Sequence, residues 1–387
     1  MDAPLADPSW TDADVLSARS RAWAATMAGH QDGPARLAHR DSGAGVGHLT
    51  PLLREEREFT EHVAFIPGAT RSEGAGERAV EEEPDPVRTC FERDRDRILH
   101  CNAYRRLAGK TQVFVFPGDH QRTRLTHAIE VAQVARSIAQ ACRLNVALAE
   151  AIALGHDCGH GPGGHASEDA LSPFLEGGYD HAVWGADVVL APLNLCAQTI
   201  DGIRNHSWSR PAPSTPEGEV VSWADRIAYV CHDFEDAVSA GIVTPDVLPP
   251  IVRELCGTTR SSQLNAFIRA VVSCVARTGQ VGMDEQVADA LAAFRSSNYE
   301  RIYLRPSSQQ QAAAVIAMLS ALVEHYADRP NLIPSVQRVG GMVAATPEAV
   351  RAAVTYVGGM TDRFACEQAV GLLGWERDRL PQGVDTH

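Results

Sequence analysis

Most of this chain repeats its apolar residues with the period of an α-helix, and this pattern limits the possible fold more than any other feature. One predicted helix carries Val131, Ala135, Ile138 and Cys142 on a single face. Segments with this period are 127–143, 146–156, 222–241, 284–295 and 311–327. The only good β-strand candidate is 112–116, QVFVF, which Pro117 and Gly118 would end. We therefore predict an all-α fold, mainly α with minor β.

The N-terminal part differs in composition from the rest. Residues 1–48 are rich in Ala, Gly, Asp and Arg with weak periodicity, so we predict an appendage with one short helix near 17–27. The turn-rich, acidic stretch 71–86 is predicted to be an exposed connection. The predicted main domain is 49–387, with a core of about 95–240 and a C-terminal helical part of about 241–375.

Charge and composition exclude several classes of protein. The 35 basic and 49 acidic side chains give a net charge of −14, which is unfavourable for general nucleic-acid binding. No apolar run approaches the roughly 18 residues that span a bilayer, and the N-terminus has no apolar signal segment, so we expect a cytoplasmic protein without membrane contact. The nine cysteines form no CxxC pair, which argues against a disulfide framework or a cysteine zinc site.

Histidine and aspartate concentrate at the ends and on the polar faces of the predicted helices. His127 opens one helix, the pair His156 and Asp157 closes the next, and Asp225 lies on a third. Two imidazoles and two carboxylates suit a divalent ion, with Mn²⁺, Fe²⁺, Co²⁺, Ni²⁺ and Zn²⁺ all compatible. We therefore predict a metal site formed by these four residues.

The adjacent pair His156 and Asp157 can share one ion only where the helix ends. We expect Gly155 and Gly159 to supply the necessary backbone freedom. The alternative is a solvated polar face with capping side chains.

The loop GHGPGGHASE after this pair holds candidates for proton transfer. It contains His160, His165 and Glu168, and the last two are three residues apart. On a helical turn, Glu168 would orient the His165 imidazole, as a general acid or base requires. His181, in GGYDHAVWG, is a further candidate. Each histidine taken alone is equally compatible with a structural role.

Basic residues surround the predicted metal ligands, and guanidinium groups bind phosphate oxygens in bidentate geometry. The arginines are Arg105, Arg106, Arg122, Arg124 and Arg226. Lys110, in KTQ, is the only lysine of the chain. We expect a phosphate-bearing substrate and a ligand-binding or site-supporting role for Lys110; the alternative is a set of ordinary surface cations.

Seven segments in this order resemble the deoxynucleoside triphosphate triphosphohydrolases (dGTPases and dGTPase-like proteins) of the HD-domain superfamily. They are RDRDRILHCNAYRRLAGKTQVF, GDHQRTRLTHAIEVAQVARSIA, AEAIALGHDCGHGPGGHASE, GGYDHAVWGA, DGIRNHS, TPEGEVVSWADRIAYVCHDFEDA and GGMTDRFA. The resemblance covers about residues 51–370. It implies a helical HD fold and metal-dependent hydrolysis of a dNTP to deoxynucleoside and triphosphate, with water attacking the α-phosphorus.

The resemblance also implies roles for individual residues. The metal ligands are His127, His156, Asp157 and Asp225, the catalytic residues are His165 and Glu168 assisted by His160 and His181, and the substrate-binding residues are Gln112, Arg124, Arg226, Tyr229 and Asp233. Tyrosine packs under the deoxyribose, and glutamine and aspartate read its 3′-hydroxyl. Mn²⁺ or Mg²⁺ is the implied cofactor, a homo-oligomer is the implied assembly, and nucleic acid is implied only as an effector.

Two motifs depart from the family pattern. Relatives usually read L-G-H-x-P-F-G-H after the HD pair, whereas this chain has Gly163 at the bulky position, which predicts a mobile loop and an emptier pocket. Relatives usually read F-x-H-N-x-Q-S in the next motif, whereas this chain has Ala182 and Trp184 at the amide positions. Two alternatives therefore stay open: an HD phosphohydrolase for another nucleotide, such as a modified one or a monophosphate, and a nucleotide-binding regulator with little turnover.

Overall fold

The N-terminal unit of the chain is a helix followed by a hairpin. The computed structural model describes residues 17–26, 28–118, 120–339 and 341–383, and the chain divides into compact units 1–51 and 52–387. The first unit holds α1 (Ala18–Ala25), β1 (His30–Asp32) and β2 (Ala35–Leu37). The two strands pair antiparallel, with His30 opposite Leu37. The helix predicted near 17–27 is confirmed, residues 1–16 of the predicted appendage lie outside the described residues, and the predicted domain limit at residue 48 stays a prediction.

The regular elements of the second unit are helices joined by loops, with no β-strand among its described residues, which confirms the predicted all-α class. Its α-helices are α2 (Arg54–Ala64), α3 (Cys90–His100), α4 (Asn102–Arg106), α5 (Arg124–Ala141), α6 (Val146–Gly155), α7 (Ala166–Leu171), α8 (His181–Trp184), α9 (Ala197–Asn205), α10 (Pro216–Ser239), α11 (Pro250–Cys256), α12 (Arg260–Thr278), α13 (Glu285–Asn298), α14 (Pro306–Asp328), α15 (Pro334–Val339), α16 (Pro347–Gly358) and α17 (Asp362–Leu373). Short π-helical segments follow α8 and α13, at Gly185–Val189 and Tyr299–Tyr303. The five predicted helical segments coincide with α5, α6, α10, α13 and α14. None of the described helices is both long and apolar enough to cross a membrane.

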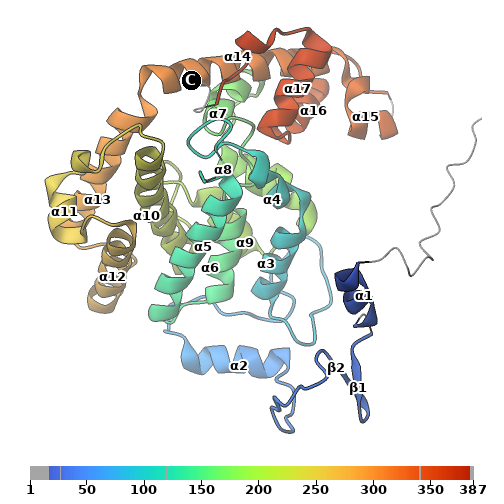
Figure 1. Cartoon of the computed structure of the whole chain (residues 1–387), viewed down its shortest axis with the longest axis vertical. Helices are drawn as coiled ribbons and strands as arrows, with labels where there is room; N and C mark the ends of the chain where they lie inside the picture. Colours follow the sequence, from blue (N-terminus) through green and yellow to red (C-terminus); the bar gives the residue numbers. More distant parts are fainter. Residues whose placement is uncertain (1–16, 27, 119, 340, 384–387) are drawn as a thin grey trace, which may run out of the picture. The chain divides into compact units, whose positions relative to one another are not determined.

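Helices α5, α6 and α10 form the centre of this unit. They pack against one another, and α3 and α9 pack on α6. Figure 1 shows α5 and α6 side by side, with α14 crossing one end of the unit together with α16 and α17. The predicted apolar face of α5 is buried here at Val131, Ala135 and Ile138. A second apolar cluster holds α7, α14, α16 and α17 together, so two cores flank the start of α5.

Capping fixes where the central helices begin. Thr123 precedes α5 in a capping box with Thr126. The Asn145 side chain accepts from the Leu148 amide at the start of α6, and Thr215 does the same for Gly218 at the start of α10. These starts place His127 in the first turn of α5, His156 at the end of α6 and Asp225 within α10.

The predicted strand at 112–116 is wrong. The segment is a series of bends, and the nearest bridge is an isolated one between Thr111, just before it, and Thr123. No neighbouring strand is available among the described residues of this unit to pair with it. Phe114 packs instead against Ala237 and Ile302, so the apolar residues of this segment serve packing against helices.

The segment 71–86 is only partly the exposed connection that its composition predicts. The Arg78 side chain is 1% exposed and pairs with the fully buried Asp94 at 2.7 Å. Asp94 also accepts from the Cys196 amide and the Thr199 hydroxyl. This buried ion pair ties the segment to α3 and α9.

Candidate metal centre

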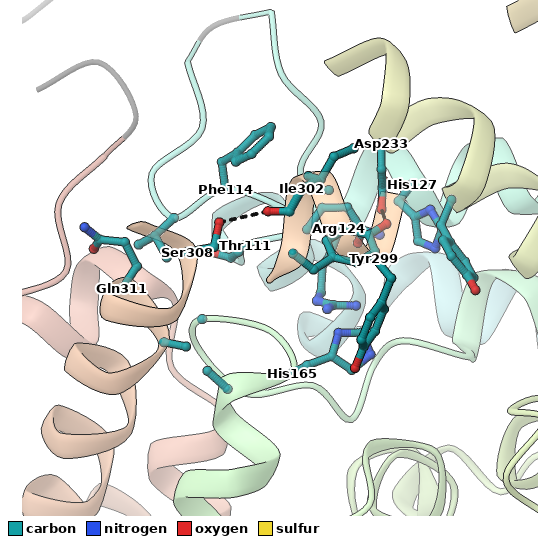
Figure 2. Close-up of a pocket in the computed structure, with 18 of the residues that line it drawn as sticks. Thr111, Phe114, Arg124, His127, His165, Asp233, Tyr299, Ile302, Ser308 and Gln311 are labelled. Atoms are coloured by element: carbon teal, nitrogen blue, oxygen red, sulfur yellow. Dashed lines mark hydrogen bonds between the residues drawn. The ribbon is translucent and has the colours of Figure 1, made fainter. Parts of the chain in front are cut away.

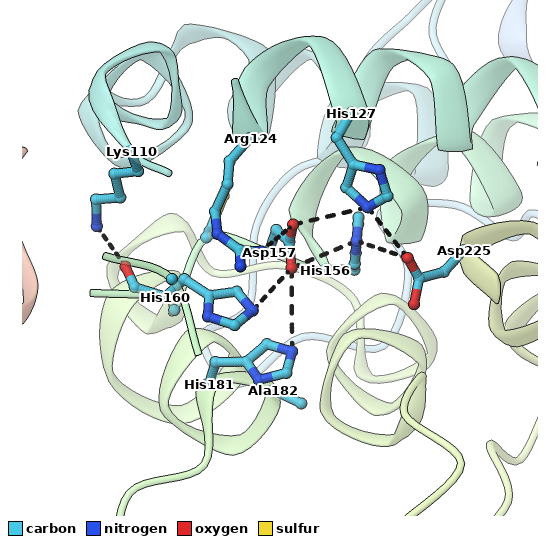
Figure 3. A network of polar contacts seen from close by, with 12 residues as sticks. Lys110, Arg124, His127, His156, Asp157, His160, His181, Ala182 and Asp225 are labelled. Atoms are coloured by element: carbon cyan, nitrogen blue, oxygen red, sulfur yellow. Dashed lines mark hydrogen bonds and ion pairs between the residues drawn. The ribbon is translucent and has the colours of Figure 1, made fainter. Parts of the chain in front are cut away.

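The four predicted metal ligands meet where α5 begins, α6 ends and α10 passes. His127 Nε2 lies 3.1 Å from Asp225 Oδ1 and 3.9 Å from Asp157 Oδ2. His156 Nε2 lies 3.5 Å from Asp157 Oδ1 and 3.7 Å from Asp225 Oδ1. Figure 3 shows the side chains converging from the three elements. Ligation by this set stays a proposal, and its geometry is compatible with one shared ion.

The surroundings of His156 leave one ring nitrogen available for a cation. Its Nδ1 donates to the carbonyl of Ala153 at 2.6 Å, which leaves the lone pair on Nε2. That Nε2 is buried and has no hydrogen-bond partner among the described residues. Burial opposes the ionisation of Asp157, but Arg124 and the nearby imidazoles hold the pKa of this carboxyl well below its usual range. A neutral imidazole beside an ionised carboxylate fits a divalent ion.

The two glycines beside the pair serve close packing. Neither Gly155 nor Gly159 has a positive φ, so the prediction that they relax the backbone direction is wrong. A Cβ at Gly155 would lie 2.5 Å from Ile203 Cδ1, and one at Gly159 would lie 2.0 Å from the carbonyl oxygen of His181. The segments around α8 and α9 therefore approach too closely for side chains here.

A cavity of about 1160 Å³ opens beside the four residues. Figure 2 shows Arg124, His127, His165 and Asp233 around it, with Gln311 of α14 on the opposite wall. The predicted site residues that line it are Gln112, Arg124, His127, Asp157, His160, His165, His181, Asp225, Arg226, Tyr229 and Asp233. Three others do not line it: His156, Glu168 and Lys110. The volume suffices for a ligand larger than most small metabolites.

His165 stands at the cavity wall as the residue before α7. Its side chain is exposed to the cavity, yet protein surrounds it on the other sides. This desolvation and the nearby Arg124 cation lower the pKa of His165 to about 4. The imidazole is therefore neutral near pH 7 and able to accept a proton.

Glu168 is paired with His181, which corrects the predicted pairing with His165. Glu168 Oε1 accepts from the His181 backbone amide at 2.9 Å and from His181 Nδ1 at 2.5 Å. His165 occupies the N-cap position of α7 without a side-chain capping bond, and the Glu168 carboxylate in the first turn of that helix reaches the start of α8 instead. Burial opposes its ionisation, but the bonds from His181 lower the pKa of Glu168 to about 2.

Arg124 and Arg226 are placed to bind an anion in the cavity. The Arg124 side chain donates from Nη1 to Asp157 Oδ2 at 2.7 Å, while its Nε and Nη2 are buried without partners. Arg226 lies over the Trp208 ring, 3.5 Å from its centroid, and its Nε is also unpaired. Buried N–H groups without acceptors are costly, so these donors favour an anionic ligand.

Arg122 belongs to a structural network. It pairs with Glu130 at 2.7 Å and with Glu235 at 2.8 Å, and it also pairs with Asp236. It does not line the cavity. The predicted contact of Arg122 with a phosphate is therefore unsupported by its position.

The residues predicted to hold a sugar face the same cavity with free polar atoms. Tyr229 Oη accepts from Arg295 Nε at 2.8 Å, and Asp233 Oδ2 accepts from the Tyr303 hydroxyl. Asp233 Oδ1 and Gln112 Oε1 have no partner. Burial raises the pKa of Asp233 to about 7, so this carboxyl is able to donate as well as accept near neutral pH.

Lys110 is a support of the site. It is 3% exposed, and its Nζ donates to the carbonyl of Gly358 at 2.9 Å and to the carbonyl of His160. Burial lowers its pKa to about 7. Of the two roles predicted for Lys110, its position favours site support.

Asp362, at the start of α17, connects three segments around the site, and sequence analysis did not single it out. Its carboxylate accepts from the Thr111 amide at 2.8 Å, from the Thr111 hydroxyl, and from the Gly163 amide at 2.8 Å. Its signal in the sequence is the motif GGMTDRFA, which has no chemical pattern of its own. Asp362 thus positions both the KTQ segment and the loop before α7.

We expect Asp362→Ala to destabilise the protein by about 2–4 kcal/mol, because three donors would lose their charged acceptor. Urea unfolding followed by circular dichroism measures this. Asp378→Ala, at an exposed position, is the matched control and should change the free energy of unfolding by less than about 0.5 kcal/mol. Equal effects of the two variants would contradict the positioning role.

His206 is a second residue that sequence analysis did not select. It follows α9 as His156 follows α6, and its Nδ1 donates to the carbonyl of Ile203 at 2.8 Å. It is 2% exposed and lines the cavity. Its signal in the sequence was the histidine of the segment DGIRNHS.

Known proteins are similar to this chain in sequence over most of its length. The HD domain model matches residues 124–230, which contain the four candidate ligands, and the phosphohydrolase-associated domain model matches residues 281–370. A deoxyguanosinetriphosphate triphosphohydrolase-like protein of Caldanaerobacter subterraneus is 38% identical over 320 residues, covering 81% of this chain and 93% of the relative. The chain belongs to the deoxyguanosinetriphosphate triphosphohydrolase-like family.

Further members of this family match over similar lengths. The one from Clostridium perfringens strain 13 is 38% identical and covers 82% of this chain and 96% of the relative. The one from Desulfatibacillum aliphaticivorans is 38% identical, and the match covers 81% of this chain and 95% of the relative. A solved phosphohydrolase from Bacteroides thetaiotaomicron aligns with a TM-score of 0.45 and 15% identity, covering 71% of this chain and 69% of that one, and adds nothing to the assignment. The predicted family is confirmed, and with it an HD-domain hydrolase.

The two departures from the usual motifs of the triphosphohydrolase-like family have structural explanations. Gly163 has a φ of +74°, and a Cβ there would lie 2.4 Å from Val315 Cγ1. The Val315 side chain fills the space beside Gly163, so the predicted emptier pocket is not found at this position. The Gly163 amide donates to Asp362, and this bond restrains the loop that was predicted to be mobile. Trp184 packs between Tyr179 and Arg351 and does not line the cavity, so its replacement of an amide concerns packing.

Proposed function

We propose that this protein hydrolyses deoxynucleoside triphosphates to a deoxynucleoside and inorganic triphosphate in a reaction that requires a divalent ion, with Mn²⁺ or Mg²⁺ as the first candidates. The observation that carries this proposal is the convergence of His127, His156, Asp157 and Asp225 beside a large cavity that also holds the unpaired donors of Arg124. The names of the relatives support the same activity.

The ion would be held by the two imidazoles and two carboxylates. When bound, it would neutralise and orient a phosphate oxygen. Arg124 then binds the phosphates through its free Nε and Nη2, and Arg226 adds a second cation farther along the cavity. The protein thereby concentrates positive charge where the triphosphate would lie, despite its net charge of −14.

The chain's own residues supply the remaining steps. Neutral His165 accepts a proton at a ring nitrogen from the water that attacks the α-phosphorus. The bond between this phosphorus and the 5′-oxygen breaks, and protonated His165 returns its proton to the departing 5′-oxygen. Asp233 and Gln112 hold the 3′-hydroxyl through the atoms that have no partner in the protein.

A substrate panel tests the proposal. Purified full-length protein with Mn²⁺ or Mg²⁺ should release deoxynucleosides from dNTPs much faster than nucleosides from rNTPs, and should leave monophosphates intact. Turnover confined to a monophosphate or a modified nucleotide would favour the alternative HD phosphohydrolase. If the protein binds nucleotides but hydrolyses none of them, the result would favour the alternative of a nucleotide-binding regulator. The proposal includes a homo-oligomer, and light scattering of the purified protein would give its molecular mass in solution.

Tyr229 is proposed to exclude the 2′-hydroxyl of ribonucleotides with its ring. We expect Tyr229→Ala to lower the ratio of kcat/KM for dNTP over rNTP by about tenfold or more, because the space under the sugar would open. Tyr229→Phe is the matched control: it keeps the ring, loses the bond from Arg295 and should keep the ratio. An unchanged ratio in Tyr229→Ala would contradict this role.

A further inference from the structure

A half-exposed tryptophan forms part of the cavity wall. Trp208 lies in the loop between α9 and α10, lines the cavity and is 46% exposed. It belongs to none of the apolar clusters that the described residues form. The ring therefore adds little to the core of the protein, and its contacts indicate another role.

Two contacts hold the Trp208 ring in one orientation. Its Nε1 donates to the carbonyl of Ser222 at 3.0 Å. The ring also meets that of Trp223 edge to face, with the centroids 4.7 Å apart and the planes at 76°. Ser222 and Trp223 lie on α10, the helix that carries Asp225 and Arg226. The tryptophan is thus fixed to the same helix as the arginine.

The face of this ring contacts the guanidinium of Arg226. Its Cζ lies 3.5 Å from the ring centroid, well within the range of a cation–π contact. An N–H group that pointed at the ring would clash at this distance. The guanidinium plane therefore lies along the ring, and its N–H groups point outward at the edge, where an anion can accept from them.

Arg226 differs in its support from the other arginines near the site. Arg122 pairs with carboxylates, and Arg124 pairs with Asp157. Among the described residues Arg226 has no ion pair with a carboxylate, and its Nε has no hydrogen-bond partner. An aromatic face holds a guanidinium without neutralising its charge or occupying its donors, so both stay available to an anion in the cavity.

We propose that Trp208 is a positioning residue: its ring holds the Arg226 guanidinium in place to bind the phosphate chain of the substrate. This inference rests on the proposed function, in which Arg226 binds phosphate oxygens. Trp208 itself contacts neither the reacting phosphorus nor the ion in this scheme. Its effect passes entirely through Arg226, which makes the two residues energetically coupled.

Binding of inorganic triphosphate tests this role without reference to turnover. Its Kd is measured by isothermal titration calorimetry of the full-length protein with Mn²⁺ present, and KM and kcat are measured with a dNTP. We expect Trp208→Ala to raise Kd and KM about tenfold and to change kcat less than about twofold, because the lost contact stabilises ground state and transition state alike. Trp208→Phe keeps an aromatic face and should keep Kd within about threefold.

A double variant shows whether Trp208 acts through the arginine. Arg226→Gln alone should raise Kd at least as much as Trp208→Ala, and the two changes together should raise it no further. The matched control is Trp375→Ala. Trp375 also contacts an arginine, with Arg379 Cζ 4.4 Å from its ring centroid, but it does not line the cavity, so Kd should be unchanged.

The outcomes separate this role from the proposed function. An unchanged Kd in either single variant, or losses that add in the double variant, would overturn the role of Trp208. Those results together with triphosphate release from dNTPs would leave the proposed function intact. Coupled losses of triphosphate affinity without hydrolysis of any dNTP would contradict the proposed function and retain the role of Trp208.

Discussion

Replacing Asp157 with asparagine should abolish metal binding and lower kcat by at least about 10³-fold, while helical content stays near that of the unmodified protein. Asp157 faces His127 through one oxygen and His156 through the other. Loss of its charge would remove about 4 kcal/mol or more of transition-state stabilisation if the ion is lost. The asparagine oxygen still accepts from Arg124, so the guanidinium keeps a partner and the core should hold.

Asp169→Asn provides the control for this change. Asp169 is an exposed carboxylate on α7, close in sequence to the site, and its loss should leave metal content and kcat unchanged. The measurements are elemental analysis, circular dichroism and steady-state kinetics on both variants. Full metal content in Asp157→Asn would contradict the ligand set.

Replacing His165 with alanine should lower kcat by about 10²–10⁴-fold with metal content unchanged. This is the usual contribution of a positioned proton acceptor. His165 lines the cavity but contributes no atom to the candidate ligand groups among the described residues. Since its pKa is about 4, protonation removes the acceptor as the pH falls through about 4, so kcat of the unmodified enzyme should decline there.

His325→Ala, on α14 and outside the cavity lining, is the matched control and should retain kcat. Single-turnover kinetics separates chemistry from binding in both variants. A His165→Ala enzyme with normal kcat, or one that has lost its metal, would contradict the role of His165 in proton transfer.

The fold and the four candidate ligands were predictable because both depend on local features. The apolar period of the segment 127–143 specifies which face of α5 is buried, and that face leaves His127 at the polar start of the helix. The pair His156 and Asp157 consists of residue types that bind divalent ions, so it indicates a metal site. These features are encoded within short stretches of sequence.

The errors concern contacts between distant segments. Residues 112–116 have the Val and Phe content of a strand, but strand formation depends on a partner that the described residues do not provide. Gly159 is required by the carbonyl of His181, and Asp362 bonds to Thr111 from 251 positions away. No local sequence pattern indicates that two distant segments come into such close contact. The wrong pairing of Glu168 has the same cause, because its partner His181 lies on another helix.

The most direct test of the proposed activity is the identity and labelling of the products. The protein is incubated with each dNTP and Mn²⁺ in ¹⁸O-enriched water, and the products are resolved by ion-exchange chromatography and mass spectrometry. Attack at the α-phosphorus with release of the 5′-oxygen predicts unlabelled deoxynucleoside and intact triphosphate carrying one ¹⁸O. Deoxynucleoside monophosphate with pyrophosphate, or diphosphate with orthophosphate, would contradict it.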